Sequence, residues 1–459
     1  MGKTRRDFLA QAAGVGMGCA LAGIAQPGIA HPRIAQPQGN ASSPAPLRFG
    51  VNYTPRRLWW YCWQDWDQQA ILDDLEGIAS LGMDHIRAQC LWPVFQPGIN
   101  VVNERAVENL HRLLDAADRC SLDVEVTVLN GWMSGLSFLP AWSAPLAVGH
   151  GGDAGNMFLS DAVIAAEQLL FQRIAASVGE HRRFLGFDIG NELGVLMTGA
   201  NAVTTAQADA WATRMLGHCD RLAPGGFHVN GADHSHWFAD FGFSRSTLAN
   251  TGAATAIHSY IYFDGVLNRF APDSPEAQHL AAYEVELATA YQHDPARPVW
   301  VEEIGVGDVE MPAAAKPGFM ERTVELLARR SNLWGITWWC SHDIDPAIGG
   351  FSTYEYTLGL LDGKNRAKPL GRQFASLART LRQQRPQPLR GRTALVIPDA
   401  GPESRLSSRA WPPDWRFASA WMRRIAMGND PAIVLESRAD DEDYLRQRWI
   451  NNLVPLAKA

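Results

Sequence analysis

Residues 298–305, Pro-Val-Trp-Val-Glu-Glu-Ile-Gly, are the stretch that decides the fold. The apolar run 299–301 is typical of a short strand that is buried on both faces of a parallel sheet. Such a strand has little reason to end in two acids unless they act at its carboxyl end, where barrel enzymes place their active sites. A second strand, 184–189, runs into Gly190-Asn191-Glu192 in the same way. Glutamates at the ends of two strands predict two-carboxylate chemistry of the kind that glycosidases use.

The composition is that of an ordinary globular protein and excludes several classes. The chain has 459 residues, 46% of them hydrophobic and 19% charged, with a formal net charge of −7. No basic patch is dense enough to favour a nucleic-acid partner. Beyond the first 25 residues the five cysteines are scattered, without a CxxC pair, and no HExxH is present. We therefore expect no disulfide framework, no metal site and no cofactor.

The first 46 residues read as a leader and a linker. Residues 4–9, Thr-Arg-Arg-Asp-Phe-Leu, form a twin-arginine signal, and the apolar stretch 10–25 that follows is too short to span a membrane. We expect residues 1–25 to be a signal peptide and the protein to be periplasmic or secreted. A lipid anchor at Cys19 is the minor alternative. Residues 26–46 are rich in Pro, Gln, Ala and Ser and predict an extended linker.

Residues 47–385 alternate between strand and helix patterns. Such alternation predicts a parallel sheet, and eight units predict a closed (β/α)8 TIM barrel. Every strand except the fifth is followed by a recognisable helix. The predicted strands are 47–53, 84–87, 124–129, 184–189, 227–230, 254–260, 299–301 and 335–339. The predicted helices are 67–81, 104–120, 161–178, 204–222, 274–293, 317–330 and 369–383.

Residues 386–459 predict a small α/β region after a Pro/Arg-rich linker. Strand patterns at 394–398 and 432–436 alternate with helix patterns at 415–427 and 440–449. This region is short for a domain of its own. Its role, its completeness and its packing on the barrel are left open by the sequence.

The strand-end glutamates differ in what their surroundings predict. Glu192 follows an apolar strand, so burial should raise the pKa of its carboxyl and keep it protonated, as a general acid requires. A salt bridge at the barrel edge is the alternative. Glu302 and Glu303 are adjacent, so on a regular strand their side chains point to opposite sides. Only one of them is then expected to enter the barrel mouth, and alternation alone does not say which.

Other strands also end in residues suited to sugar chemistry. Arg87 ends the second strand, and a buried arginine there needs a carboxylate such as Glu303. His258 and Tyr260 end the sixth strand, where they could bond a sugar hydroxyl or the nucleophile. Trp132 follows the third strand and Trp339 ends the eighth, and indole rings stack on the flat faces of sugars. The alternatives are a structural ion pair for Arg87 and ordinary packing for the others.

Taken together, these short motifs resemble the clan A glycoside hydrolases, and most closely family 5, the cellulase/mannanase family. The resemblance spans residues 47–381 and rests on the order of the motifs along successive strands. It implies that Glu192 is the acid/base and Glu303 the nucleophile. It also implies that Asn191 holds the substrate 2-hydroxyl and that Arg87 and Tyr260 support Glu303. The spacing of the family's tryptophan from a preceding glycine selects Trp339 over Trp338.

The resemblance implies a retaining β-glycoside hydrolase with an oligo- or polysaccharide substrate. The paired Glu302-Glu303 is similar to mannan-active members, so β-mannosides are the expected substrates, as for a mannanase or β-mannosidase. A β-glucan or β-galactoside hydrolase is the alternative within enzymes, and a catalytically idle sugar-binding barrel is the alternative outside them. Sugar, linkage, exo or endo action and oligomeric state are left open.

Overall fold

The structure is a computed structural model that describes residues 46–143, 155–384, 390–399 and 415–455. The predicted twin-arginine signal, Cys19 and residues 26–45 of the predicted linker lie outside this range. Within it, none of the helices combines the length and apolarity needed to cross a membrane.

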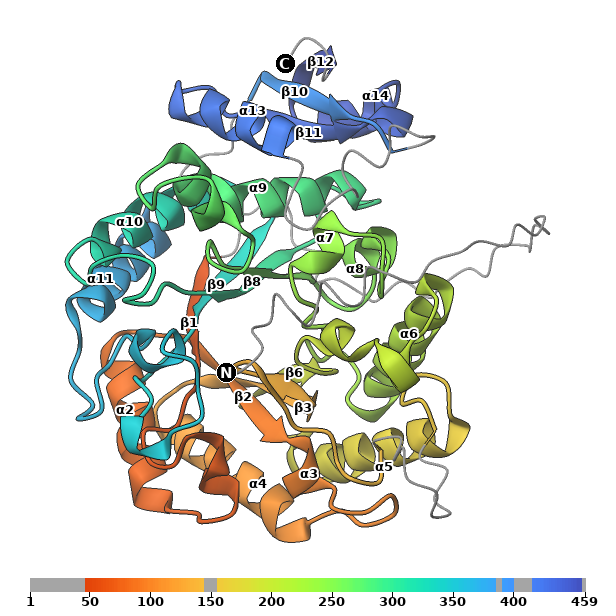
Figure 1. Cartoon of the computed structure of the whole chain (residues 1–459), viewed down its shortest axis with the longest axis vertical. Helices are drawn as coiled ribbons and strands as arrows, with labels where there is room; N and C mark the ends of the chain where they lie inside the picture. The colour runs from red at the N-terminus through yellow and green to blue at the C-terminus, as the bar shows by residue number, and fades with distance from the viewer. Residues whose placement is uncertain (1–45, 144–154, 385–389, 400–414, 456–459) are drawn as a thin grey trace. The chain divides into compact units, whose positions relative to one another are not determined.

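Seven parallel strands form the central sheet, in the order β6-β3-β2-β1-β9-β8-β7. Within this sheet the first strand in sequence, β1, pairs with the last, β9, as closure of a barrel requires. Helices surround these strands in Figure 1. The predicted (β/α)8 TIM barrel is therefore confirmed. The strands are β1 Arg48–Asn52, β2 His85–Leu91, β3 Asp123–Asn130, β6 Phe184–Asp188, β7 Thr255–Ser259, β8 Val299–Ile304 and β9 Leu333–Trp338.

The fifth predicted strand, 227–230, is reduced to an extended segment between β6 and β7. The Val229 N–H donates to the Phe187 carbonyl at 2.9 Å, and the Ile189 N–H donates to the Val229 carbonyl at 3.0 Å. Only one isolated bridge, Asp188 with Val229, meets the definition of parallel pairing. Two short helices, α7 Ser235–Phe238 and α8 Arg245–Asn250, follow this segment, where the sequence shows no recognisable helix pattern.

The barrel helices begin at capping residues that the sequence provides. Asp67 accepts a hydrogen bond from the Ala70 N–H, and Asn103 accepts one from the Ala106 N–H. Both satisfy backbone donors that a helix start leaves unpaired. The helices are α2 Gln68–Ser80, α4 Glu104–Arg119, α5 Asp161–Val178, α6 Thr205–Leu222, α9 Pro275–Tyr291, α10 Lys316–Ala328 and α11 Pro369–Gln383.

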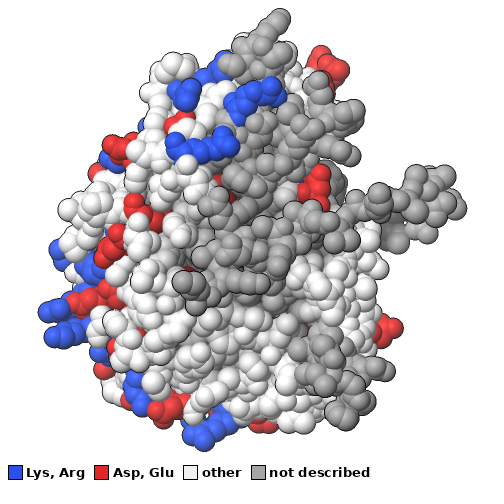
Figure 2. Space-filling model, in the orientation of Figure 1, with Lys and Arg blue, Asp and Glu red and all other residues white. Residues whose placement is uncertain are grey.

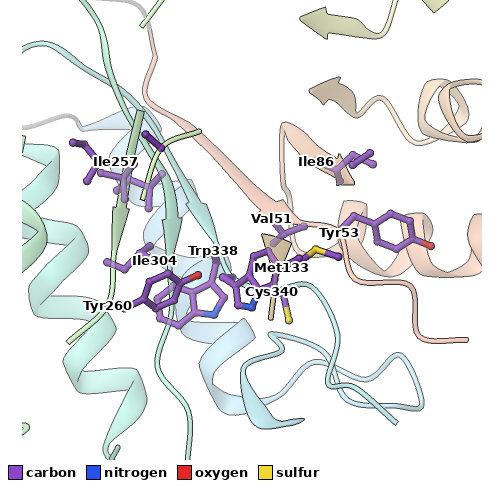
Figure 3. Packing of buried hydrophobic residues seen from close by; sticks show 14 of the residues in the cluster. Val51, Tyr53, Ile86, Met133, Ile257, Tyr260, Ile304, Trp338 and Cys340 are labelled. Atoms are coloured by element: carbon purple, nitrogen blue, oxygen red, sulfur yellow. The ribbon is translucent and has the colours of Figure 1, made fainter. Parts of the chain in front are cut away.

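Large apolar side chains fill the space between the strands and the helices. Every residue of β2 and of β8 is buried. Trp338 on β9 packs against Phe374 of α11 with the rings tilted and 5.9 Å between their centroids. Ile304 pairs with Trp338 across the sheet and lies beside Tyr260 in Figure 3. The residue that follows Glu303 is therefore held in the apolar core, which fixes the position of the glutamate.

The C-terminal elements form a parallel three-stranded sheet. β10 Arg392–Ile397 lies between β11 Ala432–Leu435 and β12 Ile450–Pro455, accompanied by α13 Trp415–Ala426 and α14 Glu442–Gln447. The predicted helix at 440–449 ends earlier than expected, and β12 was not predicted.

These C-terminal elements pack on the barrel helix α9. Trp421 of α13 contacts Tyr283 of α9, with 5.6 Å between the ring centroids. Glu286, also on α9, accepts hydrogen bonds from Arg330, Arg392 and Arg448. Two of these three arginines come from the C-terminal elements, so a buried carboxylate joins them to the barrel. Whether residues 386–459 are a separate domain stays a prediction.

The described cysteines form no disulfide, and the charged side chains are distributed over the surface as follows. The cysteines of the described residues are all free, and four of the five are buried. Figure 2 shows acidic and basic side chains interspersed along one margin of the visible face. At the top of that view several basic side chains lie near one another.

Candidate active site

The structure brings the two predicted carboxylates together at the carboxyl ends of their strands. Glu192 follows β6 and is 5% exposed, while Glu303 lies near the end of β8 and is 3% exposed. One carboxylate oxygen of Glu192 lies within 4.8 Å of one from Glu303. The pair is thus close enough to act on a single anomeric carbon.

Arg87 is a buried cation that reaches three carboxylates. Its Nη1 lies 2.5 Å from Oε1 of Glu303, its Nη2 lies 2.5 Å from Oδ2 of Asp188, and its Nε lies 3.0 Å from Oε1 of Glu302. Burial alone would lower the pKa of Arg87, but these carboxylates outweigh it and raise the pKa above its ordinary value. The predicted contact of Arg87 with Glu303 is therefore present, and the guanidinium stays charged.

Asn191 is fixed between two partners. Its Oδ1 accepts from Nη2 of Arg87 at 2.8 Å, and its Nδ2 donates to the backbone carbonyl of Trp132 at 2.6 Å. The amide is therefore held in one orientation beside Glu192. Trp132 is predicted to stack on sugar, and it is 8% exposed.

His258 lies between three glutamates. Its Nδ1 is 3.1 Å from Oε1 of Glu192 and 3.5 Å from Oε2 of Glu303, and its Nε2 is 3.1 Å from Oε2 of Glu302. Burial lowers the pKa of His258, but the charge of Glu303 and the contacts with Glu192 and Glu302 outweigh it and raise the pKa to about 10. His258 is therefore an imidazolium at neutral pH and donates from both nitrogens.

The surroundings of Glu303 pull its pKa in two directions. Burial raises the pKa, and the charge of Glu192 raises it further. The charges of His258 and Arg87 oppose this, as does the Tyr260 hydroxyl, which donates to Oε2 of Glu303 at 2.7 Å. The net direction is upward. The ionised form that a nucleophile needs thus depends on these three neighbours.

Glu302 contradicts the expectation from strand alternation. Its side chain is fully buried and contacts Arg87 and His258, the two residues that also contact Glu303. The pairing of β7 with β8 explains this: Ile257 pairs with Val301, but His258 pairs with Glu303, so Glu302 is skipped. A bulge adds one residue to a strand and interrupts the alternation of side chains. Both glutamates therefore face the same cation cluster.

Glu192 sits in an unusual backbone conformation. Its φ is 48° and its ψ is 38°, in the left-handed region that few residues other than glycine adopt. Its N–H donates to the Gly231 carbonyl at 2.8 Å. Backbone strain of this kind is concentrated at functional sites, and the bond to Gly231 helps to hold it here.

The two tryptophans at the end of β9 have different environments. Trp338 is fully buried in the core, where its indole N–H donates to the Leu358 carbonyl. Trp339 is 5% exposed and interacts with the carboxyl of Glu355, which in turn feels the charges of Glu303 and Glu192. Trp339 therefore lies beside a carboxyl near the catalytic pair, whereas Trp338 lies in the core. Its contact with substrate stays a prediction.

Three residues of this site were missed by sequence reasoning. Asp188 is fully buried, bonded to Arg87, and its Oδ2 accepts from the Thr127 hydroxyl at 2.9 Å. A charged residue inside an otherwise apolar strand was an available signal for it. Glu302 was assigned to the opposite side because a bulge leaves no clear mark in sequence. Glu355 lies in a loop, where no periodic pattern exists to place it.

One group of described residues could ligate a metal ion, namely Glu192, His258 and Glu303. A cation there would have to displace the proton of His258, and it would occupy both catalytic carboxylates. The arrangement is explained by charge balance between the glutamates and the imidazolium. The histidines of the fifth strand and the loop after it have other partners: His228 contacts the Phe187 N–H at 3.0 Å and the Ala223 carbonyl at 2.9 Å, and His234 lies 3.4 Å from Asp264.

Two carboxylates lie close together at the carboxyl edge of the barrel. An arginine, an imidazolium and a tyrosine surround one of them. This arrangement defines a glycoside hydrolase site. Comparison with known structures identifies the family. The chain is 37% identical to a GH5_18 protein from Streptomyces cattleya, solved with GlcNAc; the match covers 91% of this chain and 100% of that one, with a TM-score of 0.84. The chain therefore belongs to glycoside hydrolase family 5, subfamily 18.

Relatives from Bifidobacterium longum agree with this. The GH5_18 protein of subspecies infantis is 30% identical, with 90% of this chain and 97% of that chain covered and a TM-score of 0.80. A Glu-to-Ala variant of the GH5_18 protein of subspecies longum, solved with Manβ1-4GlcNAc, is 32% identical, with 89% and 96% covered and a TM-score of 0.79. Neither a scan of family models nor a search of curated proteins gave a match.

Proposed function

We propose that this protein is a retaining β-mannosidase that releases mannose from the non-reducing end of Manβ1-4GlcNAc or a saccharide ending in that unit. Two of its relatives, from Streptomyces cattleya and Bifidobacterium longum, were solved with Manβ1-4GlcNAc as Glu-to-Ala variants. The observation that carries the proposal is the pair of buried carboxylates whose closest oxygens lie within 4.8 Å.

In this mechanism Glu303 attacks the anomeric carbon of mannose while Glu192 donates a proton to the glycosidic oxygen. The bond from C1 to that oxygen breaks as the bond from C1 to Glu303 forms. Glu192 then removes a proton from water, which attacks C1 and releases Glu303 as a carboxylate. Retaining enzymes hold their carboxyl groups about 5–5.5 Å apart, and inverting enzymes about 6.5–9.5 Å apart. The short separation of Glu192 and Glu303 supports retention.

Arg87 and His258 help to give the two glutamates different protonation states. Arg87 and His258 both contact Glu303, which favours its ionised form as the nucleophile. When both glutamates are ionised they repel each other across less than 5 Å. Formation of the ester removes the charge from Glu303 and with it this repulsion, so Glu192 can then act as a carboxylate base toward water.

Hydrolysis of a substrate panel tests the proposal. The panel holds p-nitrophenyl β-mannoside, β-glucoside and β-galactoside together with Manβ1-4GlcNAc and β-mannan, each with wild type and Glu303→Ala. We expect the wild type to act on the mannoside and the disaccharide, and the variant to be inactive while keeping its fold. A preference for the glucoside or the galactoside would favour those activities instead. Sugar binding without turnover would favour an idle sugar-binding barrel.

We also propose that the protein is exported through its twin-arginine motif at Arg5-Arg6. Fractionation of cells that produce the full chain, beside an Arg5→Lys, Arg6→Lys variant, tests this. We expect the wild type outside the cytoplasm and the variant inside it. Equal distribution of both forms would refute export by this route.

A further inference from the structure

Glu355 is a buried carboxyl at the active site that the hydrolytic mechanism does not use. It begins the short helix η6, Glu355–Thr357, in the loop that follows β9, and it is 5% exposed. The Ser134 hydroxyl and the Trp339 indole interact with its carboxyl, and the charges of Glu303 and Glu192 act on it. Glu355 therefore lies beside the catalytic pair without belonging to it.

Glu355 and Ser134 lie close to each other, but one polar atom of each makes no hydrogen bond of good geometry. Oε2 of Glu355 and Oγ of Ser134 are both buried, and neither has a hydrogen-bond partner of good geometry among the described residues. A buried polar atom without a partner costs free energy, so proteins rarely keep one without a reason. Sugar hydroxyls both donate and accept, and they would satisfy a carboxylate and a serine hydroxyl together.

The loops that carry these two residues meet across one side of the barrel mouth. Ser134 lies between β4 Trp132–Met133 and β5 Leu136–Ser137, in the loop that follows β3, whereas Glu355 follows β9. In the sheet, β1 and β2 separate β3 from β9. A contact between Ser134 and Glu355 therefore spans the mouth above β1 and β2. Glu303 and His258 lie on β8 and β7, beyond β9.

Aromatic side chains also pack together on the side of the barrel mouth above β1 and β2. Trp59, in the helix η1 Trp59–Trp63 that follows β1, packs against Phe351 with 4.8 Å between ring centroids and against Phe138 with 5.6 Å. Phe138 belongs to the loop of Ser134, and Phe351 to the loop of Glu355. Three loops are thus joined by rings on the side above β1 and β2. A sugar whose anomeric carbon meets Glu303 on β8 and whose ring extends across β9 would have its opposite end toward this side.

We propose that Glu355, with Ser134, binds the 4-hydroxyl and a neighbouring hydroxyl of the mannose ring and so restricts hydrolysis to a terminal β-mannosyl residue. This inference rests on the proposed β-mannosidase function. A carboxylate accepts from two adjacent hydroxyls at once, which suits the end of the ring opposite C1. A substituent on the 4-hydroxyl, as inside a β-1,4-linked chain, would meet the closed wall instead. Glu355 is then a determinant of exo action.

The inference is tested by the discrimination between p-nitrophenyl β-mannoside and its 4-deoxy analogue. A site built to bond a hydroxyl rejects the analogue that lacks it. We expect wild-type kcat/KM to fall about 10- to 100-fold for the 4-deoxy compound, as for loss of a hydrogen bond to a charged group. In Glu355→Gln and Glu355→Ala the ratio should fall toward one. Ser134→Ala should reduce it less. Loss of folding alone would lower both rates equally and leave the ratio unchanged.

Glu167→Gln is the matched control. Glu167 is also a fully buried carboxyl that accepts from a tryptophan, with Trp211 Nε1 at 3.0 Å from its Oε2, but it lies on α5. The ratio of kcat/KM for p-nitrophenyl β-mannoside to kcat/KM for its 4-deoxy analogue should be the same in Glu167→Gln as in wild type. An active Glu355→Gln variant with the wild-type ratio would overturn the inference and leave the proposed function standing. A wild type inactive on β-mannosides would refute the proposed function, and the inference with it.

Discussion

His258 and Glu302 form a buried contact between neighbouring strands: Nε2 of the imidazole lies 3.1 Å from Oε2 of the glutamate. The bulge in β8 makes this possible, because it turns Glu302 toward the same ring that faces Glu303. The imidazolium is thereby shared between a glutamate that takes part in the reaction and one that does not. Glu302 helps to keep His258 charged, and His258 favours ionisation of Glu303.

Replacement of His258 by glutamine should move the acidic limb of the pH profile upward. That limb of kcat/KM reports the ionisation of the nucleophile in the free enzyme. Loss of a cation near Glu303 raises the pKa of its carboxyl, so we expect a shift of about 1 to 3 pH units. Profiles of wild type and variant on an aryl β-mannoside measure it. His111→Gln, on the outer helix α4, is the control. An unshifted limb in the variant would show that His258 does not act on Glu303.

Replacement of Glu302 by glutamine should move the same limb in the opposite direction. The variant removes a negative charge next to Glu303, while His258 keeps its contacts with Glu192 and Glu303. The pKa of Glu303 should therefore fall, and the acidic limb should move to lower pH. The same profile measures it. An upward shift would mean that His258 loses its proton without Glu302, and that the charge of His258 depends on Glu302 more than on the catalytic pair.

Replacement of Glu192 by alanine should affect substrates according to their leaving groups. An acid catalyst matters most for a poor leaving group, where general acid–base catalysis contributes about 10²- to 10⁴-fold. We expect a loss of that order in kcat/KM for Manβ1-4GlcNAc and a much smaller loss for 2,4-dinitrophenyl β-mannoside. Azide should restore turnover of the activated substrate by attacking the glycosyl-enzyme. Equal losses on both substrates, without azide rescue, would exclude Glu192 as the acid/base.

Glu286 should make the C-terminal elements sensitive to acid. Burial raises the pKa of Glu286, but Arg392, Arg448 and Arg330 outweigh it and lower the pKa to about 2. Because the folded pKa lies below the unfolded value of about 4.3, the stabilisation is fully present above that pH and is lost as the pH falls toward 2.

Glu286→Gln should therefore lower the free energy of unfolding by about 3–5 kcal/mol at neutral pH, since it removes the carboxylate that Arg330, Arg392 and Arg448 share. Urea unfolding measures this, and the difference from wild type should shrink in acid. Asp161→Asn is the control: its side chain is 92% exposed and pairs with Arg214 at 3.3 Å. Its effect should stay below about 1 kcal/mol. A Glu286→Gln variant as stable as wild type would contradict the inference that Glu286 and its arginines stabilise the C-terminal elements on the barrel.

The barrel could be predicted because its strands are buried on both faces and its helices carry one apolar face, so each has a clear pattern. The fifth strand, 227–230, bonds to β6 through backbone hydrogen bonds at Phe227 and Val229, but only one bridge there meets the definition of parallel pairing. Strand β12 escaped notice because it lies at the edge of its sheet, where Asn451 and Asn452 are exposed and break the apolar run.

The site was predictable where a motif ends a strand, and not where long-range packing decides. Glu192, Glu303 and Arg87 each end or follow a strand, and the barrel brings such ends together. The orientation of Glu302 depends on a bulge set by pairing with β7, and the position of Glu355 depends on how the loop after β9 packs near Ser134 and Trp339. Neither the orientation of Glu302 nor the position of Glu355 can be predicted from the residues next to it in the sequence.

The anomer of mannose first released from Manβ1-4GlcNAc tests the central claim most directly. Proton NMR during hydrolysis, at times shorter than mutarotation, distinguishes the two anomers. A retaining mechanism through Glu303 predicts that β-mannose appears first and that the α-anomer grows in afterwards. Initial release of α-mannose would mean inversion and would contradict the role of Glu303 as nucleophile. Absence of mannose would contradict the β-mannosidase function itself.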